Sequence, residues 1–164
     1  MVRRITITIL LALLSLPTFS NAGPLAAVGD AAPVFTSKLS TGSVVRLNQY
    51  RGRTVLLTFW ATWCAPCLRE LPEIDAAYSA FKQQGLDVLA INFGEDTATI
   101  NTYLKKQNLA LPVTKDEELD IANAYGVFAL PKTFFINPDG VITKVVVGGS
   151  LTTENIGDII NRKH

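Results

Sequence analysis

The 164-residue chain has few of the residues that bind metals or cofactors. Its two cysteines are Cys64 and Cys67, and its single histidine is His164. A structural zinc site takes four ligands, and these residues cannot supply them. No glycine-rich phosphate loop, HExxH or GxSxG motif occurs. The sequence therefore predicts neither a metal centre nor a nucleotide or flavin site.

An excess of charge is also missing. The chain carries 15 Lys and Arg against 14 Asp and Glu, a formal net charge of +1. Basic residues form no run, so the sequence gives no support for nucleic-acid binding.

The N-terminus predicts a signal peptide over residues 1–22. Two arginines precede an uncharged apolar run, Ile5–Leu16, which is shorter than the roughly 20 residues that span a bilayer. Small residues ending at Ala22 predict cleavage there and leave 23–164 as one domain. The alternative is an uncleaved membrane anchor, and only in that case is membrane attachment expected. Export places the cysteines where disulfides form and persist.

Both cysteines follow an apolar stretch, Thr54–Phe59, that is typical of a buried strand. A strand that delivers Cys-x-x-Cys to the start of a helix favours thiol–disulfide exchange. Cys64 is expected at the helix N-terminus, in a turn that exposes it, where free N–H groups and the helix dipole favour a thiolate. Cys67 lies one turn further on the same face, close enough to form a disulfide with Cys64.

Two other interpretations of the cysteine pair remain open. A purely structural disulfide over two intervening residues would constrain the unfolded chain little. A pair of inert buried cysteines conflicts with Pro66, which fits the first turn of a helix that begins at an exposed Cys64. The sequence favours redox chemistry over both.

Strands and helices alternate along the rest of the chain. Strands are expected at 34–36, 43–47, 54–59, 86–93, 111–114, 133–136 and 141–147, and helices at 64–84, 97–108, 117–125 and 152–161. This order predicts an α/β fold with a central sheet and helices on both faces. The final hairpin makes the sheet mixed.

Several motifs together resemble the TlpA/ResA-like thiol–disulfide oxidoreductases, exported proteins of the thioredoxin fold that include cytochrome c maturation reductases. The motifs are Phe59–Cys67, Glu70–Pro72, Tyr125–Val127, Leu130–Ile136 and Asp139–Gly140. The resemblance runs from about residue 32 to residue 162. It implies a thioredoxin-like fold with short N-terminal strands and a helix-bearing insertion between the cysteines and the last hairpin.

The resemblance also implies roles for individual residues. Cys64 would attack the substrate and Cys67 would resolve the mixed disulfide. Pro131 matches a cis proline that faces the disulfide, although an ordinary edge-strand proline is an alternative. Leu130 would offer its backbone to an extended substrate by strand addition, and Trp63 is expected to contact partners.

Acidic residues complete the candidate site. Glu70 matches a family acid, one helical turn beyond Cys67, while a solvated helix charge is the alternative. Thr58 stands where plain thioredoxins carry a buried Asp, so proton handling does not run through that position. Glu95 and Asp96 follow a strand and are expected to cap a helix.

The predicted function is reduction of protein disulfides through Cys64 and Cys67, in the periplasm or otherwise outside the cytoplasm. The expected partners are disulfide-containing client proteins and a membrane electron donor. Disulfide donation, isomerisation and a non-catalytic client-binding module are the alternatives. Peroxidase activity is not expected, because the peroxiredoxin pattern Pro-x-x-x-Thr-x-x-Cys is absent.

Overall fold

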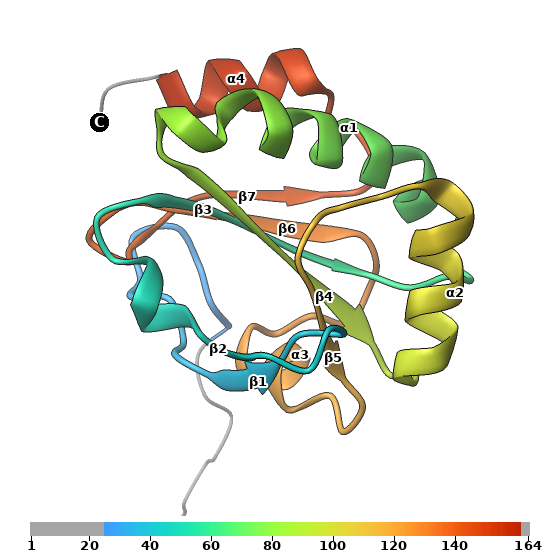
Figure 1. Ribbon diagram of the computed structural model, residues 1–164. Helices are drawn as coiled ribbons and strands as arrows, with labels where there is room; N and C mark the ends of the chain where they lie inside the picture. The colour runs from blue at the N-terminus through green and yellow to red at the C-terminus, as the bar shows by residue number, and fades with distance from the viewer. Residues whose placement is uncertain (1–24, 162–164) are drawn as a thin grey trace, which may run out of the picture.

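The computed structural model describes residues 25–161, so the predicted signal peptide lies outside the described residues. A five-stranded sheet in the order β5-β4-β3-β6-β7 forms its centre (Figure 1). The strands are β3 (Thr54–Trp60), β4 (Leu86–Phe93), β5 (Val113–Asp116), β6 (Lys132–Ile136) and β7 (Ile142–Val147). β3, β4 and β5 are parallel, whereas β6 and β7 are antiparallel to their neighbours. The predicted mixed sheet is confirmed.

A short antiparallel hairpin precedes this sheet. Its strands are β1 (Thr36–Lys38) and β2 (Val44–Arg46), followed by the 3-10 helix η1 (Leu47–Tyr50). Leu39 forms a bridge to Thr114 of β5, which attaches the hairpin to the edge of the main sheet. The first strand begins two residues later than predicted.

Helices cover both faces of the sheet. They are α1 (Ala65–Phe81), which continues into the 3-10 helix η2 (Lys82–Gln84), α2 (Thr97–Gln107), α3 (Asp120–Ala124) and α4 (Thr153–Asn161). In Figure 1, α1 and α4 lie together on one face, and α3 lies with the N-terminal hairpin on the other. In the sequence, α2, β5 and α3 follow one another between β4 and β6, so the predicted insertion does carry helices. The thioredoxin-like fold class is confirmed.

The predicted helix over 117–125 is shorter than expected. It begins only at Asp120, because Leu119 adopts a left-handed conformation with φ of 60°. The buried carboxylate of Asp116 accepts hydrogen bonds from the N–H groups of Ile121 and Ala122 in the first turn. An acidic acceptor at a helix N-terminus satisfies donors that have no partner within the helix.

β3 divides the core into two halves. Leu56 and Trp60 pack on the face that α1 covers, and Val55, Leu57 and Phe59 pack on the opposite face. A strand buried on both faces needs apolar side chains at successive positions, which explains its unbroken apolar run.

One end of the sheet gathers segments that are distant in the sequence. Trp60, the last residue of β3, pairs with Asn92 of β4, and Phe59 pairs with Lys132 at the start of β6. Lys132 in turn pairs with Val147 at the end of β7. The chain segments 61–64, 94–96, 128–131 and 148–151 therefore meet at this end, where the candidate site lies.

Candidate active site

Cys64 and Cys67 form a disulfide at the start of α1, with their Cα atoms 5.3 Å apart. Cys64 is the N-cap residue, and its sulfur accepts a hydrogen bond from the N–H of Cys67 over 3.3 Å. Pro66 occupies the first turn, where a missing N–H costs no helical hydrogen bond. The predicted placement of Cys64 at the helix N-terminus is confirmed.

The predicted exposure of Cys64 is wrong for this oxidised state. Cys64 is 5% exposed and Cys67 is 1% exposed, and both pack in the core half that contains Trp60. The disulfide holds the Cys64 sulfur over the first helical turn instead of out in solvent. Cys64 is still the more accessible of the two sulfur-bearing residues.

The two tryptophans of the motif have opposite environments. Trp60 is completely buried, with its ring centroid 5.4 Å from that of Tyr103 in α2. Trp63 is 67% exposed, and it lies in the turn that the N–H of Cys64 closes by donating to the carbonyl of Ala61. Trp63 is therefore a surface residue beside the disulfide, and its contact with partners stays a prediction.

The peptide bond between Leu130 and Pro131 is cis, as the resemblance implies. Pro131 is buried, and its carbonyl accepts a hydrogen bond of 3.0 Å from the N–H of Gly148. Leu130 has no backbone–backbone hydrogen bond within residues 25–161. These two residues precede β6 at the sheet end where the disulfide lies.

The segment after β7 contacts the cysteine helix directly, a contact that is absent from the sequence-based predictions. A Cβ atom on Gly149 would lie 2.9 Å from the carbonyl oxygen of Pro66, between the two cysteines. Any side chain at this position would force the two backbones apart. The Gly148-Gly149 pair was the available signal, since adjacent glycines indicate close backbone approach or an unusual turn.

Glu70 is buried in α1, so its interpretation as a solvated helix charge is wrong. The residue is 3% exposed, and its Oε1 accepts a hydrogen bond of 2.8 Å from the N–H of Leu151. Its Oε2 has no hydrogen-bond partner among residues 25–161. Burial raises the pKa of Glu70, while the N–H groups of Leu151 and Ser150 oppose that shift. The catalytic role of Glu70 stays a prediction.

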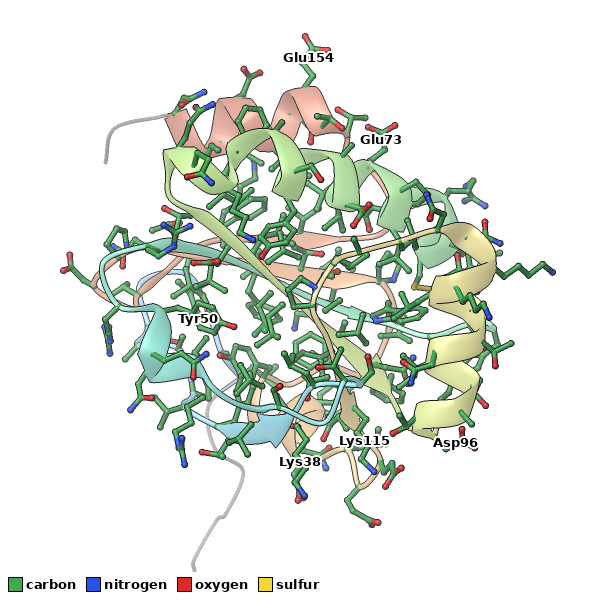
Figure 2. All side chains as sticks on the ribbon, viewed as in Figure 1. Lys38, Tyr50, Glu73, Asp96, Lys115 and Glu154 are labelled. Atoms are coloured by element: carbon green, nitrogen blue, oxygen red, sulfur yellow. A yellow bond between two sulfur atoms is a disulfide. The ribbon has the colours of Figure 1, made fainter. Side chains whose placement is uncertain are left out.

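Glu73, the next acid on the same helix, has a pKa shift in the opposite direction. Glu73 accepts hydrogen bonds from the N–H and the hydroxyl of Thr153 at the start of α4, and these bonds lower the pKa of Glu73. Figure 2 shows Glu73 at the side of α1 that faces α4. Glu73 therefore helps to connect the two helices, whereas Glu70 lies inside the protein.

Position 58 of β3, where plain thioredoxins carry a buried Asp, is a threonine in this chain. Thr58 is 1% exposed, and its hydroxyl lies 2.8 Å from that of Thr133 in β6. Among the described residues, the buried carboxylates are Glu70 and Asp116. Both oxygens of Asp116 accept hydrogen bonds from backbone N–H groups of α3. Glu70 is thus the buried carboxyl group on the cysteine helix, and one of its oxygens has no hydrogen-bond partner among residues 25–161.

The two acids after β4 differ from each other. Asp96 caps α2, because its side chain accepts a hydrogen bond of 2.7 Å from the N–H of Thr99. The predicted capping role of Glu95 is wrong, since its carboxylate instead bonds Thr62 and Asn92. No pattern in the sequence links Glu95 to Thr62, which lies 33 positions earlier.

Residues 25–161 contain no cluster of three or more His, Cys, Asp or Glu side chains that could hold a metal ion. Within the same range, no helix combines the length and apolar character that crossing a membrane requires.

The fold and the site define a class: a thiol–disulfide oxidoreductase of the thioredoxin fold. Residues 28–145 match the AhpC/TSA family. The chain is 36% identical to the thiol-disulfide oxidoreductase ResA of Geobacillus thermodenitrificans, over 94% of this chain and 90% of that protein. It is 38% identical to ResA of Bacillus subtilis, over 81% of this chain and 74% of that protein. The chain belongs to the AhpC/TSA family and to its ResA-like thiol–disulfide oxidoreductases.

Solved structures agree with this assignment. A Chlorobium tepidum structure described as a DsbE-type thiol:disulfide interchange protein is 30% identical, with a TM-score of 0.76, and the match covers 82% of this chain and 96% of that one. StoA from Bacillus subtilis has a TM-score of 0.71 at 24% identity, over 80% of this chain and 100% of that one, and supports the fold.

Replacement of Glu70 by glutamine should change how stability depends on pH. Burial holds the pKa of Glu70 above its ordinary value of 4.5, so the folded state binds this proton more tightly than the unfolded chain does. The wild type therefore loses stability as the pH rises from the unfolded pKa to the folded pKa. Glu70→Gln escapes that loss, and its advantage grows by about 1.4 kcal/mol per pH unit in this window.

Urea unfolding of the oxidised proteins across that pH range measures the effect. Glu73→Gln is the matched control: because the pKa of Glu73 is lowered, its own pH-dependent window lies below the ordinary value of 4.5, so this variant should run parallel to wild type across the Glu70 window. Parallel curves for wild type and Glu70→Gln would contradict the prediction.

Proposed function

We propose that this chain is an extracytoplasmic reductase of protein disulfides, with Cys64 as the attacking thiol. The observation that carries the proposal is the position of Cys64 as N-cap of α1, where its sulfur accepts the N–H of Cys67. A hydrogen bond and the positive end of a helix both stabilise a thiolate, which is the nucleophile in thiol–disulfide exchange.

The reaction has two exchange steps. The Cys64 thiolate attacks one sulfur of the client disulfide, and the other client sulfur leaves as a thiolate that takes up a proton. Cys67 then attacks the Cys64 sulfur of the mixed disulfide and releases the second client thiol. Two electrons pass to the client, and the protein ends with the Cys64–Cys67 disulfide that the structure contains.

The second step requires Cys67 to lose its proton. Glu70 lies one turn beyond Cys67 in α1, and its Oε2 has no hydrogen-bond partner within the part of the chain that the structure describes. A carboxyl group with a raised pKa exchanges protons closer to neutral pH than an ordinary glutamate does. We assign Glu70 as the group that accepts the Cys67 proton.

Leu130 and Trp63 supply the proposed client contacts. The backbone of Leu130 has no backbone partner in the described chain, so it is available to pair with an extended client segment. Trp63 offers an exposed aromatic surface beside Cys64. Client cysteines in an extended, unfolded segment would fit both features.

The proposed direction follows from the hydrogen bonds at the sulfur. Pro66 has no N–H, so it cannot stabilise the reduced Cys64 thiolate. A reduced form with fewer stabilising contacts is more easily oxidised and makes the pair a reductant. A membrane electron donor would then restore the dithiol. Disulfide donation, isomerisation and simple client binding are the competing functions.

The N-terminal sequence supports a place outside the cytoplasm, because residues 1–22 have the pattern of an export signal. The TlpA/ResA resemblance supports cytochrome c maturation as the pathway. The client would then be a disulfide between the two cysteines of a C-x-x-C-H haem-attachment motif.

Cys67→Ala should trap the client, because it keeps the attacking thiol and lacks the resolving one. Mixing it with an oxidised C-x-x-C-H peptide should give a stable mixed disulfide at Cys64, detected by mass spectrometry. Cys64→Ala is the matched control and should not trap, since Cys67 is 1% exposed. Trapping by Cys64→Ala alone would reverse the roles. No trapping, together with no peptide reduction by wild type, would favour the client-binding module.

The reduction potential of the cysteine pair distinguishes a reductase from a disulfide donor. We expect a value near that of thioredoxin, roughly −270 mV, and far from the oxidising end at about −120 mV. Equilibration with glutathione redox buffers, read by the reduced fraction, gives the number. A potential at the oxidising end would make disulfide donation the better assignment.

N-terminal sequencing of the full chain, produced in a bacterium with a periplasm, tests the location. The expected mature protein begins at Gly23 and is released with the periplasmic fraction. A chain that keeps Met1 and sediments with membranes would identify an anchored form. Recovery of the intact chain from the cytoplasm would contradict an extracytoplasmic function.

A further inference from the structure

Glu95, in the loop between β4 and α2, is held from two sides. Its Oε2 accepts hydrogen bonds of 2.8 Å from the backbone N–H of Thr62 and of 2.8 Å from the Asn92 side chain. Its Oε1 accepts a bond from the Thr62 hydroxyl. The N–H of Glu95 donates to Oδ1 of Asn92 over 3.1 Å. Both carboxylate oxygens are therefore occupied by the turn before Cys64 and by the end of β4.

The two sides of this contact differ in rigidity. Asn92 is completely buried in β4, directly opposite Trp60 of β3, so it forms a fixed support. Thr62 is the second residue of the turn from Ala61 to Cys64, which a backbone hydrogen bond of 3.2 Å closes. Within residues 25–161, the bonds to Glu95 are the side-chain hydrogen bonds that join this turn to another strand or loop, since the remaining one, from the N–H of Cys67 to the Cys64 sulfur, is local to the start of α1.

We propose that Glu95 is a positioning residue for thiol–disulfide exchange. It fixes the turn Ala61–Cys64 to the end of β4 and thereby sets the place of the Cys64 sulfur and of the exposed Trp63. Attack of a thiolate on a disulfide requires alignment with the sulfur–sulfur bond, so a small displacement of Cys64 slows the reaction. Glu95 acts through Thr62 and does not touch the reacting sulfurs.

Capping of α2 does not explain these contacts. Asp96 caps α2 by accepting a hydrogen bond from the N–H of Thr99, and Figure 2 shows Asp96 at the N-terminal end of this helix. Asp96 and Glu95 are adjacent acids of equal charge in one loop. They therefore provide a matched pair: one supports a helix, and the other supports the active-site turn.

The test compares Glu95→Ala with Asp96→Ala in single-turnover reduction of an oxidised C-x-x-C-H peptide by the pre-reduced protein. Glu95→Ala should slow formation of the mixed disulfide by about tenfold or more. Asp96→Ala removes a cap and one negative charge and should leave the rate close to that of wild type. Thermal unfolding of both variants measures how much stability each loses.

Two further variants separate positioning from folding. Glu95→Gln should restore most of the rate, because its oxygen accepts from the Thr62 N–H and its amide donates to the Thr62 hydroxyl, which can also accept. Thr62→Val keeps the shape and the backbone bond but loses the hydroxyl, so it should slow the reaction less than Glu95→Ala does. Both changes should alter the rate without moving the stability to the same extent.

The outcomes are distinct. Equal rates for Glu95→Ala and Asp96→Ala, with a wild type that exchanges normally, would overturn the role of Glu95 and leave the proposed function intact. A Glu95→Gln variant as slow as Glu95→Ala would assign the effect to charge and also overturn positioning. The inference rests on exchange at Cys64 and Cys67, so a wild type without exchange would overturn both.

Discussion

The burial of β3 on both faces is the constraint on which the site depends. Its side chains alternate between the two core halves, so a shift of one residue would exchange Leu56 and Trp60 with Leu57 and Phe59. Pairing with β4 on one edge and β6 on the other fixes its register. The strand must therefore end at Trp60, and the chain has four residues in which to turn before Ala65 starts α1. Cys64 becomes the helix cap as a consequence of where the core ends.

Local sequence patterns were sufficient for the parts of the fold that local forces determine. The apolar run of β3, the Gly85 that follows η2, and the turn from Asn137 to Gly140 predict elements within a few residues of those observed. The start of α1 is equally local, because Pro66 and the cysteine spacing define it. The cis bond before Pro131 came instead from the family resemblance, since no local pattern distinguishes it from an edge-strand proline.

Long-range contacts account for what the sequence could not predict. Cys64 is buried in a core half that also contains residues of β3, β4 and α4, and only the folded chain brings these segments together. Glu95 is an ordinary loop acid until β3 and β4 place it beside Thr62. Helical spacing puts Glu70 one turn from Cys67, but the backbone N–H that its carboxylate accepts belongs to Leu151, which lies 81 positions away. Each of these features arises only when the sheet brings separate segments to the same end.

The placement of the buried acid on α1 connects proton exchange with the packing around the disulfide. Glu70 bonds the N–H of Leu151, and the same segment places Gly149 against Pro66 and bonds Gly148 to Pro131. Ionisation strengthens a carboxylate's bonds to N–H donors, so it tightens the attachment of this segment to α1. Burial acts in the opposite sense and favours the neutral acid. The neutral pair of Thr58 and Thr133 has no such balance, because neither hydroxyl gains or loses charge. Because Glu70 can gain or lose a proton, the contacts of the 148–151 segment with α1 and with the cis proline respond to its protonation state. A threonine at position 58 of β3 cannot provide this response, because its hydroxyl stays neutral.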